Sequence, residues 1–188
     1  MQKTIINLGK AFVGESQARN RYAAYAKIAR KEGLEEISAN FELTANQEAE
    51  HAKWLMRIIN NLKKDDQALK FETEAPTILA STKENLKAAI SGENFEYTSM
   101  YPEFANTADE ENLPKIANRL RAIAKAEANH EKRYQNFLLN LENKTTFKKE
   151  SGVEWQCRKC GYTHTGKEAI EECPSCGHPQ AYFEVICK

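Results

Sequence analysis

Two Glu-x-x-His tetrapeptides are the part of this sequence whose residue types and spacing point most clearly to chemistry. They run from Glu48 to His51 and from Glu127 to His130. Three residues advance an α-helix by roughly 300°, so the carboxylate and the imidazole of each tetrapeptide share one helix face. Carboxylate oxygens and imidazole nitrogens both bind divalent metal ions. Each tetrapeptide is therefore a candidate half of a metal site.

The elements that must position these ligands follow from apolar periodicity, which predicts four long helices. The predicted helices cover about residues 5–32, 35–63, from Ser81 to beyond Pro102, and from Pro114 to about Leu141. Residues 64–80 lack the pattern and read as a long crossover. Pro102 has no backbone N–H, so we expect it to kink the later part of the third helix. The sequence predicts a mainly α protein built on a four-helix bundle.

Each predicted helix carries at least one ionisable residue on its otherwise apolar face. These residues are Glu15, Glu48, His51, Glu93, Glu96, Glu127 and His130. Burying an unpaired carboxylate costs several kcal/mol, so five of them require compensating positive charge. One Glu from each of two helices and Glu-x-x-His from the other two is the ligand plan of di-iron carboxylate bundles. We predict two iron or manganese ions, with Glu96 one ligand beyond that plan.

Four cysteines near the end of the chain form a second candidate metal site. Cys157 and Cys160 are separated by twelve residues from Cys173 and Cys176, and a glycine follows each pair. This spacing suits a tetrahedral site of four thiolates, and the glycines permit the positive φ that lets backbone N–H groups face the sulfurs. Zinc would make the module structural, and iron would make it a one-electron carrier. Cys187 is left without a predicted role.

Composition and charge set the organisation of the chain. We expect a bundle domain over residues 1–145, a linker over 146–151 and a small β-rich domain over 152–188, which four cysteines would stabilise. Lysine plus arginine equals aspartate plus glutamate, 27 each, which gives no reason to expect a nucleic-acid partner. There is no secretory signal pattern and no run of 18 apolar residues, so we expect a cytoplasmic protein without membrane contact.

The chain resembles the rubrerythrin family over nearly its full length. The matching stretches are Gly14–Tyr22, Glu48–His51, Gly92–Pro102, Ala126–His130 and the two cysteine pairs. The resemblance implies a ferritin-like di-iron domain, a C-terminal rubredoxin-like domain with iron on four cysteines, and a peroxidase that reduces hydrogen peroxide to water in oxidative-stress defence. It also implies that the seven Glu and His residues named above bind the iron pair, and that Tyr22 and Tyr101 stand beside those ligands.

The resemblance further implies how the site is supplied with electrons. One iron would exchange Glu96 for His51 on reduction, and head-to-tail homodimers would bring one subunit's cysteine iron near its partner's di-iron site. No Gly-x-Gly-x-x-Gly motif opens a helix, so we expect an external donor, either rubredoxin or an NAD(P)H-dependent reductase. Two alternatives stay open: a ferroxidase or other iron-handling protein, and a binding protein whose cysteine module is a zinc ribbon.

Overall fold

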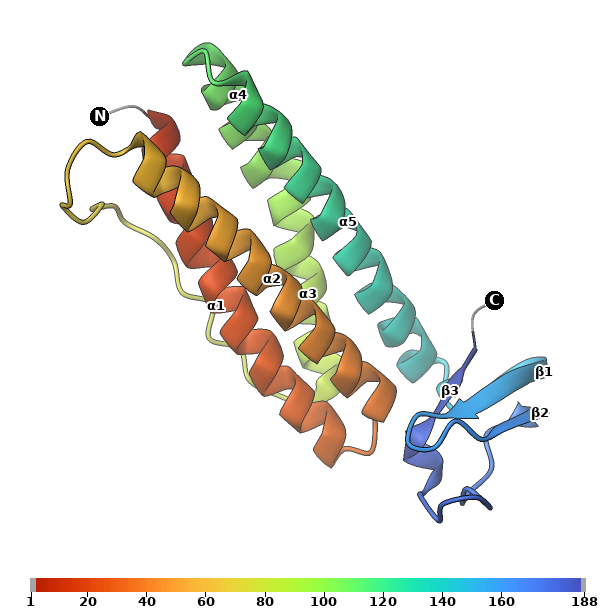
Figure 1. Ribbon diagram of the computed structural model, residues 1–188. Helices are drawn as coiled ribbons and strands as arrows, with labels where there is room; N and C mark the ends of the chain where they lie inside the picture. The colour runs from red at the N-terminus through yellow and green to blue at the C-terminus, as the bar shows by residue number, and fades with distance from the viewer. Residues whose placement is uncertain (1–2, 187–188) are drawn as a thin grey trace.

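The structure is a computed structural model that describes residues 3–186, so Cys187 lies outside the described residues. Figure 1 shows a bundle of long helices followed by a small sheet domain. The elements are α1 (Lys3–Lys31), α2 (Glu35–Leu62), α3 (Thr82–Phe95), the π-helix η1 (Glu96–Met100), α4 (Tyr101–Glu110), α5 (Pro114–Glu142), β1 (Lys148–Cys157), β2 (Thr163–Glu168), the 3₁₀ helix η2 (Gln180–Tyr182) and β3 (Phe183–Val185).

The first two helices form a hairpin closed by a glycine. Gly33 has φ 74°, and the N–H of Leu34 donates to the carbonyl of Ala29 at 2.9 Å. This left-handed residue ends α1 without the steric cost that a Cβ would bring. The end of the first helix, which the sequence predicts at about residue 32, is therefore confirmed.

The third rod of the bundle is one continuous run of α3, η1 and α4. Ser81 caps its start by accepting from the N–H of Glu84 at 3.5 Å. The disturbance expected from Pro102 takes the form of a π segment placed just before it, where the N–H of Tyr101 donates to the carbonyl of Glu96. Pro102 then falls in the first turn of α4, where its missing donor costs little. The π segment thus begins at a candidate metal ligand.

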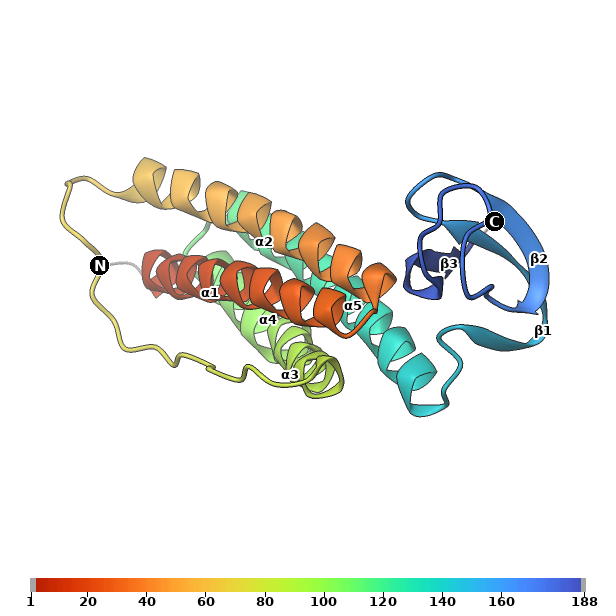
Figure 2. The same cartoon turned by 90° about the horizontal axis from the view of Figure 1, so that it is seen from below.

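The crossover between α2 and α3 runs along the side of α1 (Figure 2). A Cβ added to Gly9 would come within 2.8 Å of the Phe71 ring, so this glycine permits close approach of the crossover. Farther on, Tyr25 donates to the carbonyl of Ile78 at 2.8 Å, and Glu32 accepts from the N–H of Thr82. The crossover therefore returns the chain to the α1–α2 turn before α3 begins.

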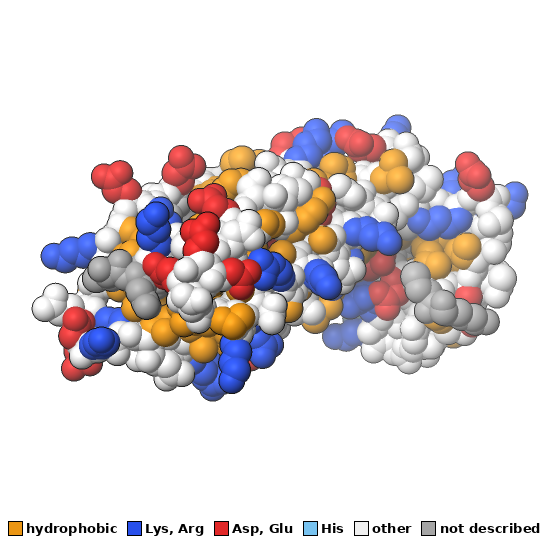
Figure 3. All heavy atoms as spheres, turned by 90° about the horizontal axis from the view of Figure 1, so that it is seen from above, with side chains coloured by type: hydrophobic (Ala, Val, Ile, Leu, Met, Phe, Trp, Pro, Cys, Tyr) orange, Lys and Arg blue, Asp and Glu red, His pale blue; other side chains and the backbone are white. Residues whose placement is uncertain are grey.

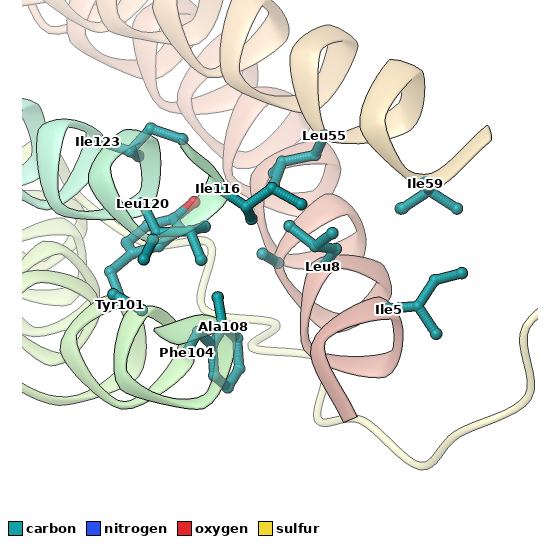
Figure 4. Close-up of a cluster of buried hydrophobic side chains, with 13 residues drawn as sticks. Ile5, Leu8, Leu55, Ile59, Tyr101, Phe104, Ala108, Ile116, Leu120 and Ile123 are labelled. Carbon is teal, nitrogen blue, oxygen red and sulfur yellow. The ribbon is translucent and has the colours of Figure 1, made fainter. Parts of the chain in front are cut away.

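Two apolar clusters fill the bundle, one toward each end. Figure 4 draws the cluster that includes Leu8, Leu55 and Leu120, with the Tyr101 ring packed among them. The second cluster includes Tyr25, Phe41, Leu86 and Tyr134. On every rod the candidate ligands fall between the residues of the first cluster and those of the second. The bundle thus holds one polar layer between two apolar layers.

The C-terminal segment forms a three-stranded antiparallel sheet in the order β2-β1-β3, with Trp155 and Phe183 in its core. Figures 1 and 2 place it beyond the α1–α2 turn, where η2 contacts α2. β1 already begins at Lys148, inside the segment we expected as a linker. The division into domains stays a prediction.

The surface carries both signs of charge. Figure 3 shows Lys and Arg interspersed with Asp and Glu over one face of the molecule, in keeping with the balanced composition. Within residues 3–186, no helix combines the length and hydrophobicity that crossing a membrane requires.

Candidate metal centres

The polar layer of the bundle collects carboxylates from every rod at almost complete burial. Four of them are at most 1% exposed: Glu15, Glu48, Glu93 and Glu127. Each lies on the inward stripe of its helix, which is why the period-3.6 pattern predicts its position. Four buried carboxylates in one layer demand positive charge beside them.

His130 supplies one focus of this layer. Its Nδ1 atom lies 2.8 Å from Glu127 Oε2, 3.0 Å from Glu48 Oε1 and 3.5 Å from Glu93 Oε2. A single ring N–H can be directed at one of these oxygens, yet three surround it. A cation bound among them satisfies all the oxygens together.

His51 supplies the second focus. Its Nδ1 atom lies 3.0 Å from Glu48 Oε2, 3.0 Å from Glu127 Oε1 and 3.7 Å from Glu15 Oε1. The two imidazole rings are 6.2 Å apart between centroids. Glu48 and Glu127 each direct one oxygen at His51 and the other at His130, whereas Glu15 contacts only His51 and Glu93 contacts only His130. The layer therefore contains two adjacent sets of four possible ligands that share two carboxylates.

Unsatisfied polar atoms show that these two sets fit metal ions. Oxygens of Glu15, Glu48, Glu93 and both oxygens of Glu127 are buried without a hydrogen-bond partner. Buried polar groups are ordinarily bonded, so such a concentration of unpaired acceptors indicates positions for cations. Mixed carboxylate and imidazole donors suit iron.

The pKa shifts in this layer also indicate that the buried carboxylates favour positive charge beside them. Burial alone would lower the pKa of His130, but the adjacent carboxylates of Glu127, Glu48 and Glu93 raise it to about 11. Burial would likewise lower the pKa of His51, and Glu127, Glu15 and Glu48 raise it instead. Burial raises the pKa of Glu93 to about 7. In the absence of metal the imidazoles thus take up protons as substitute cations.

Glu96 stands apart from the other predicted ligands. Among residues 3–186, neither set of four includes it, and its side chain is half-buried at the start of η1. Its pKa is nevertheless raised, first by burial and then by the charges of Glu15 and Glu93, so it lies close enough to interact with the cluster. Six of the seven predicted ligands are therefore brought together, with Glu96 beside them.

Two buried tyrosines bond to the outer members of the sets. The hydroxyl of Tyr22 donates to Glu93 Oε1 at 2.6 Å, and that of Tyr101 donates to Glu15 Oε1. Hydrogen bonds of this kind fix the orientation of a carboxylate that binds metal.

One buried carboxylate was not predicted. Glu131 is only 7% exposed and accepts hydrogen bonds from Asn94 and Gln135. It lies one residue past the inward stripe of its helix, where the periodic pattern predicts a solvent-facing side chain. The sequence therefore offered no signal for it.

The four predicted cysteines also meet. Their sulfurs lie within 4.8 Å of one another, with Cys157 Sγ 3.8 Å from Cys176 Sγ and Cys160 Sγ 3.6 Å from Cys173 Sγ. All four are free thiols rather than disulfides. Four converging sulfurs fit a single tetrahedral metal ion.

Two matching knuckles hold these sulfurs. Gly161 and Gly177 have φ of 80° and 70°, and each donates its N–H to the carbonyl of the first cysteine of its pair at 2.8 Å. The backbone N–H of Tyr162 lowers the pKa of Cys160 to about 6, which favours the thiolate that metals require. The conformation predicted for both glycines is confirmed.

Comparison with known families agrees with both centres. Residues 7–138 match the family described as Rubrerythrin, and residues 155–184 match the domain described as Rubrerythrin, rubredoxin-like domain. The first match covers the helices that bear the Glu and His residues. The second covers all four cysteines.

Individual relatives extend over the whole chain. A putative rubrerythrin from Methanocaldococcus jannaschii is 55% identical and covers 100% of this chain and 95% of its own length. Rubrerythrin from Porphyromonas gingivalis is 48% identical, over 97% and 89%. Among solved structures, fully reduced, all-ferrous nigerythrin aligns with a TM-score of 0.64 at 31% identity, over 97% and 86%. The predicted fold is confirmed, and the chain belongs to the rubrerythrin family, whose members combine a di-iron site with a rubredoxin-like iron site.

Proposed function

We propose that this oxidoreductase is a peroxidase that reduces hydrogen peroxide to water in the bundle, with electrons relayed through the four-cysteine centre. The observation that carries the proposal is the pair of ligand sets sharing Glu48 and Glu127. Shared carboxylates place two cations side by side, which suits attack on a bond between two oxygens. We assign Glu15, Glu48, His51, Glu93, Glu96, Glu127 and His130 to the pair, and Cys157, Cys160, Cys173 and Cys176 to the single iron.

The proposed reaction consumes one hydrogen peroxide, two protons and two electrons, and yields two waters. When bound, the iron pair supplies both electrons together, and the cysteine-bound iron transfers electrons one at a time. The chain's own part is to hold the ligands and to exclude water. Tyr22 and Tyr101 orient Glu93 and Glu15, and the apolar layers above and below close the site.

His51 marks the side from which the site can be reached. Its side chain is 19% exposed, against at most 4% for its charged neighbours in the two sets. It lines a cavity of about 350 Å³ between α2 and α5, together with Trp54 and Ile123. We infer that a molecule as small as hydrogen peroxide enters from this cavity.

We propose that an external donor, rubredoxin or an NAD(P)H-dependent reductase, supplies the electrons. We also propose a head-to-tail homodimer, because the sheet domain lies at the end of its own bundle and could reach the di-iron site of a partner subunit. Free thiols in the four-cysteine site support a reducing, cytoplasmic location.

The test is peroxide consumption by the iron-loaded, chemically reduced protein. We expect the wild type to consume peroxide and Glu127→Ala to lose that activity. Light scattering addresses the iron-handling alternative, because a storage protein must assemble into a cage and a peroxidase dimer need not. Equal peroxide consumption by wild type and Glu127→Ala would remove the assigned site from the reaction.

A further inference from the structure

Glu131 is a buried carboxylate for which the proposed reaction has no use. It follows His130 on α5 and is 7% exposed. A buried carboxylate persists only where hydrogen bonds replace its lost hydration. Asn94 Nδ2 donates to Glu131 Oε1 at 3.1 Å and to the Tyr97 hydroxyl at 3.5 Å, and Gln135 Nε2 donates to Glu131 Oε1 at 2.9 Å. We call these four residues the Glu131 clamp.

Three members of the clamp each follow a proposed metal ligand directly in sequence. Glu131 follows His130, Asn94 follows Glu93, and Tyr97 follows Glu96. Adjacent residues of a helix differ by about 100° in direction and 1.5 Å in height. The clamp therefore lies at the level of the polar layer, along its flank rather than within it.

The clamp also crosses the junction between two helix types. Asn94 belongs to α3 and Tyr97 to the π segment η1, with Asn94 Nδ2 3.5 Å from the Tyr97 hydroxyl. π segments are rare and occur mainly as single turns within α-helices, frequently at functional sites. Here the π segment contacts α5, the helix that carries Glu127 and His130.

This junction is where positional control matters most. Glu93 and Glu96 flank it, and Glu93 belongs to one ligand set with Glu127 and His130 of α5. A shift of the α3–η1 junction relative to α5 would therefore move Glu93 relative to its fellow ligands. Metal sites require ligands held to within about 0.5 Å.

We propose that Glu131 is a positioning residue for the bundle metal site: it holds Asn94, and through Asn94 the Tyr97 hydroxyl, against α5, and so sets where Glu93 and Glu96 stand. The inference rests on the proposed assignment of these two residues as ligands. It predicts that the metal site depends on the acceptor oxygen of residue 131 and not on its charge, because the amide of Asn94 needs an acceptor.

The experiment compares Glu131→Met with Glu131→Gln in the full chain, with iron in the four-cysteine site and the bundle site emptied by chelation. The probe is Co²⁺, whose affinity and visible d–d spectrum report the bundle ligands. We expect Glu131→Met to weaken Co²⁺ binding about tenfold or more and to alter the spectrum, as outer-shell changes do. Glu131→Gln keeps the acceptor oxygen and should retain wild-type affinity and spectrum.

A matched control separates positioning from general stability. Arg121 on α5 bonds to Asn106 and Asp109 on α4 at 3.1 and 2.7 Å, away from the polar layer. Arg121→Ala should change thermal stability without changing Co²⁺ binding. If Glu131→Met does not fold, Asn94→Ala, at an exposed position, removes the same contact and should show the same loss of affinity.

The outcomes are distinct. Wild-type affinity and spectrum in Glu131→Met, or in Asn94→Ala where the Met variant does not fold, would overturn the inference. So would a loss in Glu131→Gln as large as in Glu131→Met. Glu127→Ala serves as the reference for the ligand assignment. If it binds Co²⁺ normally, the proposed function fails; if it alone loses Co²⁺, the clamp fails and the proposed function stands.

Discussion

Replacing Glu127 with alanine should empty the bundle site while leaving the cysteine site loaded. Glu127 is fully buried and faces both His51 Nδ1 and His130 Nδ1, so its loss removes one ligand from each cation. Loss of an outer partner alone costs 10–100-fold in metal affinity, so loss of a shared inner ligand should cost at least about 100-fold at each position.

The loss of metal affinity can be converted into a loss of folding free energy. A cation present at about 100 times its Kd stabilises the folded protein by about 2.7 kcal/mol, so losing two such contributions removes about 5 kcal/mol. At about 2–4 °C per kcal/mol for a chain of this size, the Tm of metal-loaded Glu127→Ala should fall roughly 10–20 °C below that of the metal-loaded wild type.

Metal analysis and calorimetry together provide the assay. Iron should fall from about three ions per chain to about one, and the visible absorption of the ferric thiolate centre should persist as an internal control. Glu103→Ala, which removes an exposed carboxylate from α4, should keep all three ions. Two bundle ions retained in Glu127→Ala, with an unchanged Tm, would refute the assignment of Glu127 as a shared ligand.

Substitutions at Tyr101 and Gly161 and a change of pH test separate features of the two metal centres. Tyr101→Phe removes the hydroxyl that donates to Glu15, so it should lower the metal affinity of the bundle site about 10–100-fold. Tyr25→Phe is the control: the Tyr25 hydroxyl donates to the Ile78 carbonyl, so its loss should leave metal titrations unchanged. Gly161→Ala forces a Cβ into a φ of 80° at about 1 kcal/mol or more, so it should release cysteine-bound iron to a chelator faster than wild type, and equal release rates would count against the knuckle argument. In the metal-free protein, the pKa of Glu93 is raised to about 7, so its contribution to folding stability is present below pH 4.5 and is lost as the pH rises through 7. The pKa of His130 is raised to about 11, so its contribution starts to be lost above pH 6.5. Urea unfolding of the metal-free protein should therefore show a free energy of unfolding that falls from pH 5 to 8, and a rise over that range would contradict these pKa shifts.

The sequence made the ligand-bearing helices predictable because each carboxylate interrupts an apolar stripe of known period. Glu15 and Glu127, for example, occupy positions where a leucine would otherwise fit, and the structure buries both. The two cysteine knuckles were predictable because Cys-x-x-Cys-Gly fixes both the ligands and the left-handed glycine.

Other features depend on contacts that no local pattern contains. The disturbance at Pro102 could be absorbed as a kink or as a π segment, and the local sequence does not distinguish them; the structure has a π segment, which contacts α5. Glu131 reads as a surface residue until Asn94 and Gln135 are seen beside it. Lys148 and Lys149 look like a polar linker, yet they enter β1 because Lys148 pairs with Glu168.

The most direct test of the account is the rate at which hydrogen peroxide oxidises the cysteine-bound iron in the reduced protein, followed by the ferric thiolate absorption. We expect rapid oxidation in the wild type, because peroxide reacts in the bundle and then draws electrons from the cysteine centre, and much slower oxidation in Glu127→Ala. Equal rates in the two proteins would show that peroxide reacts without the bundle site, and the central claim would be wrong.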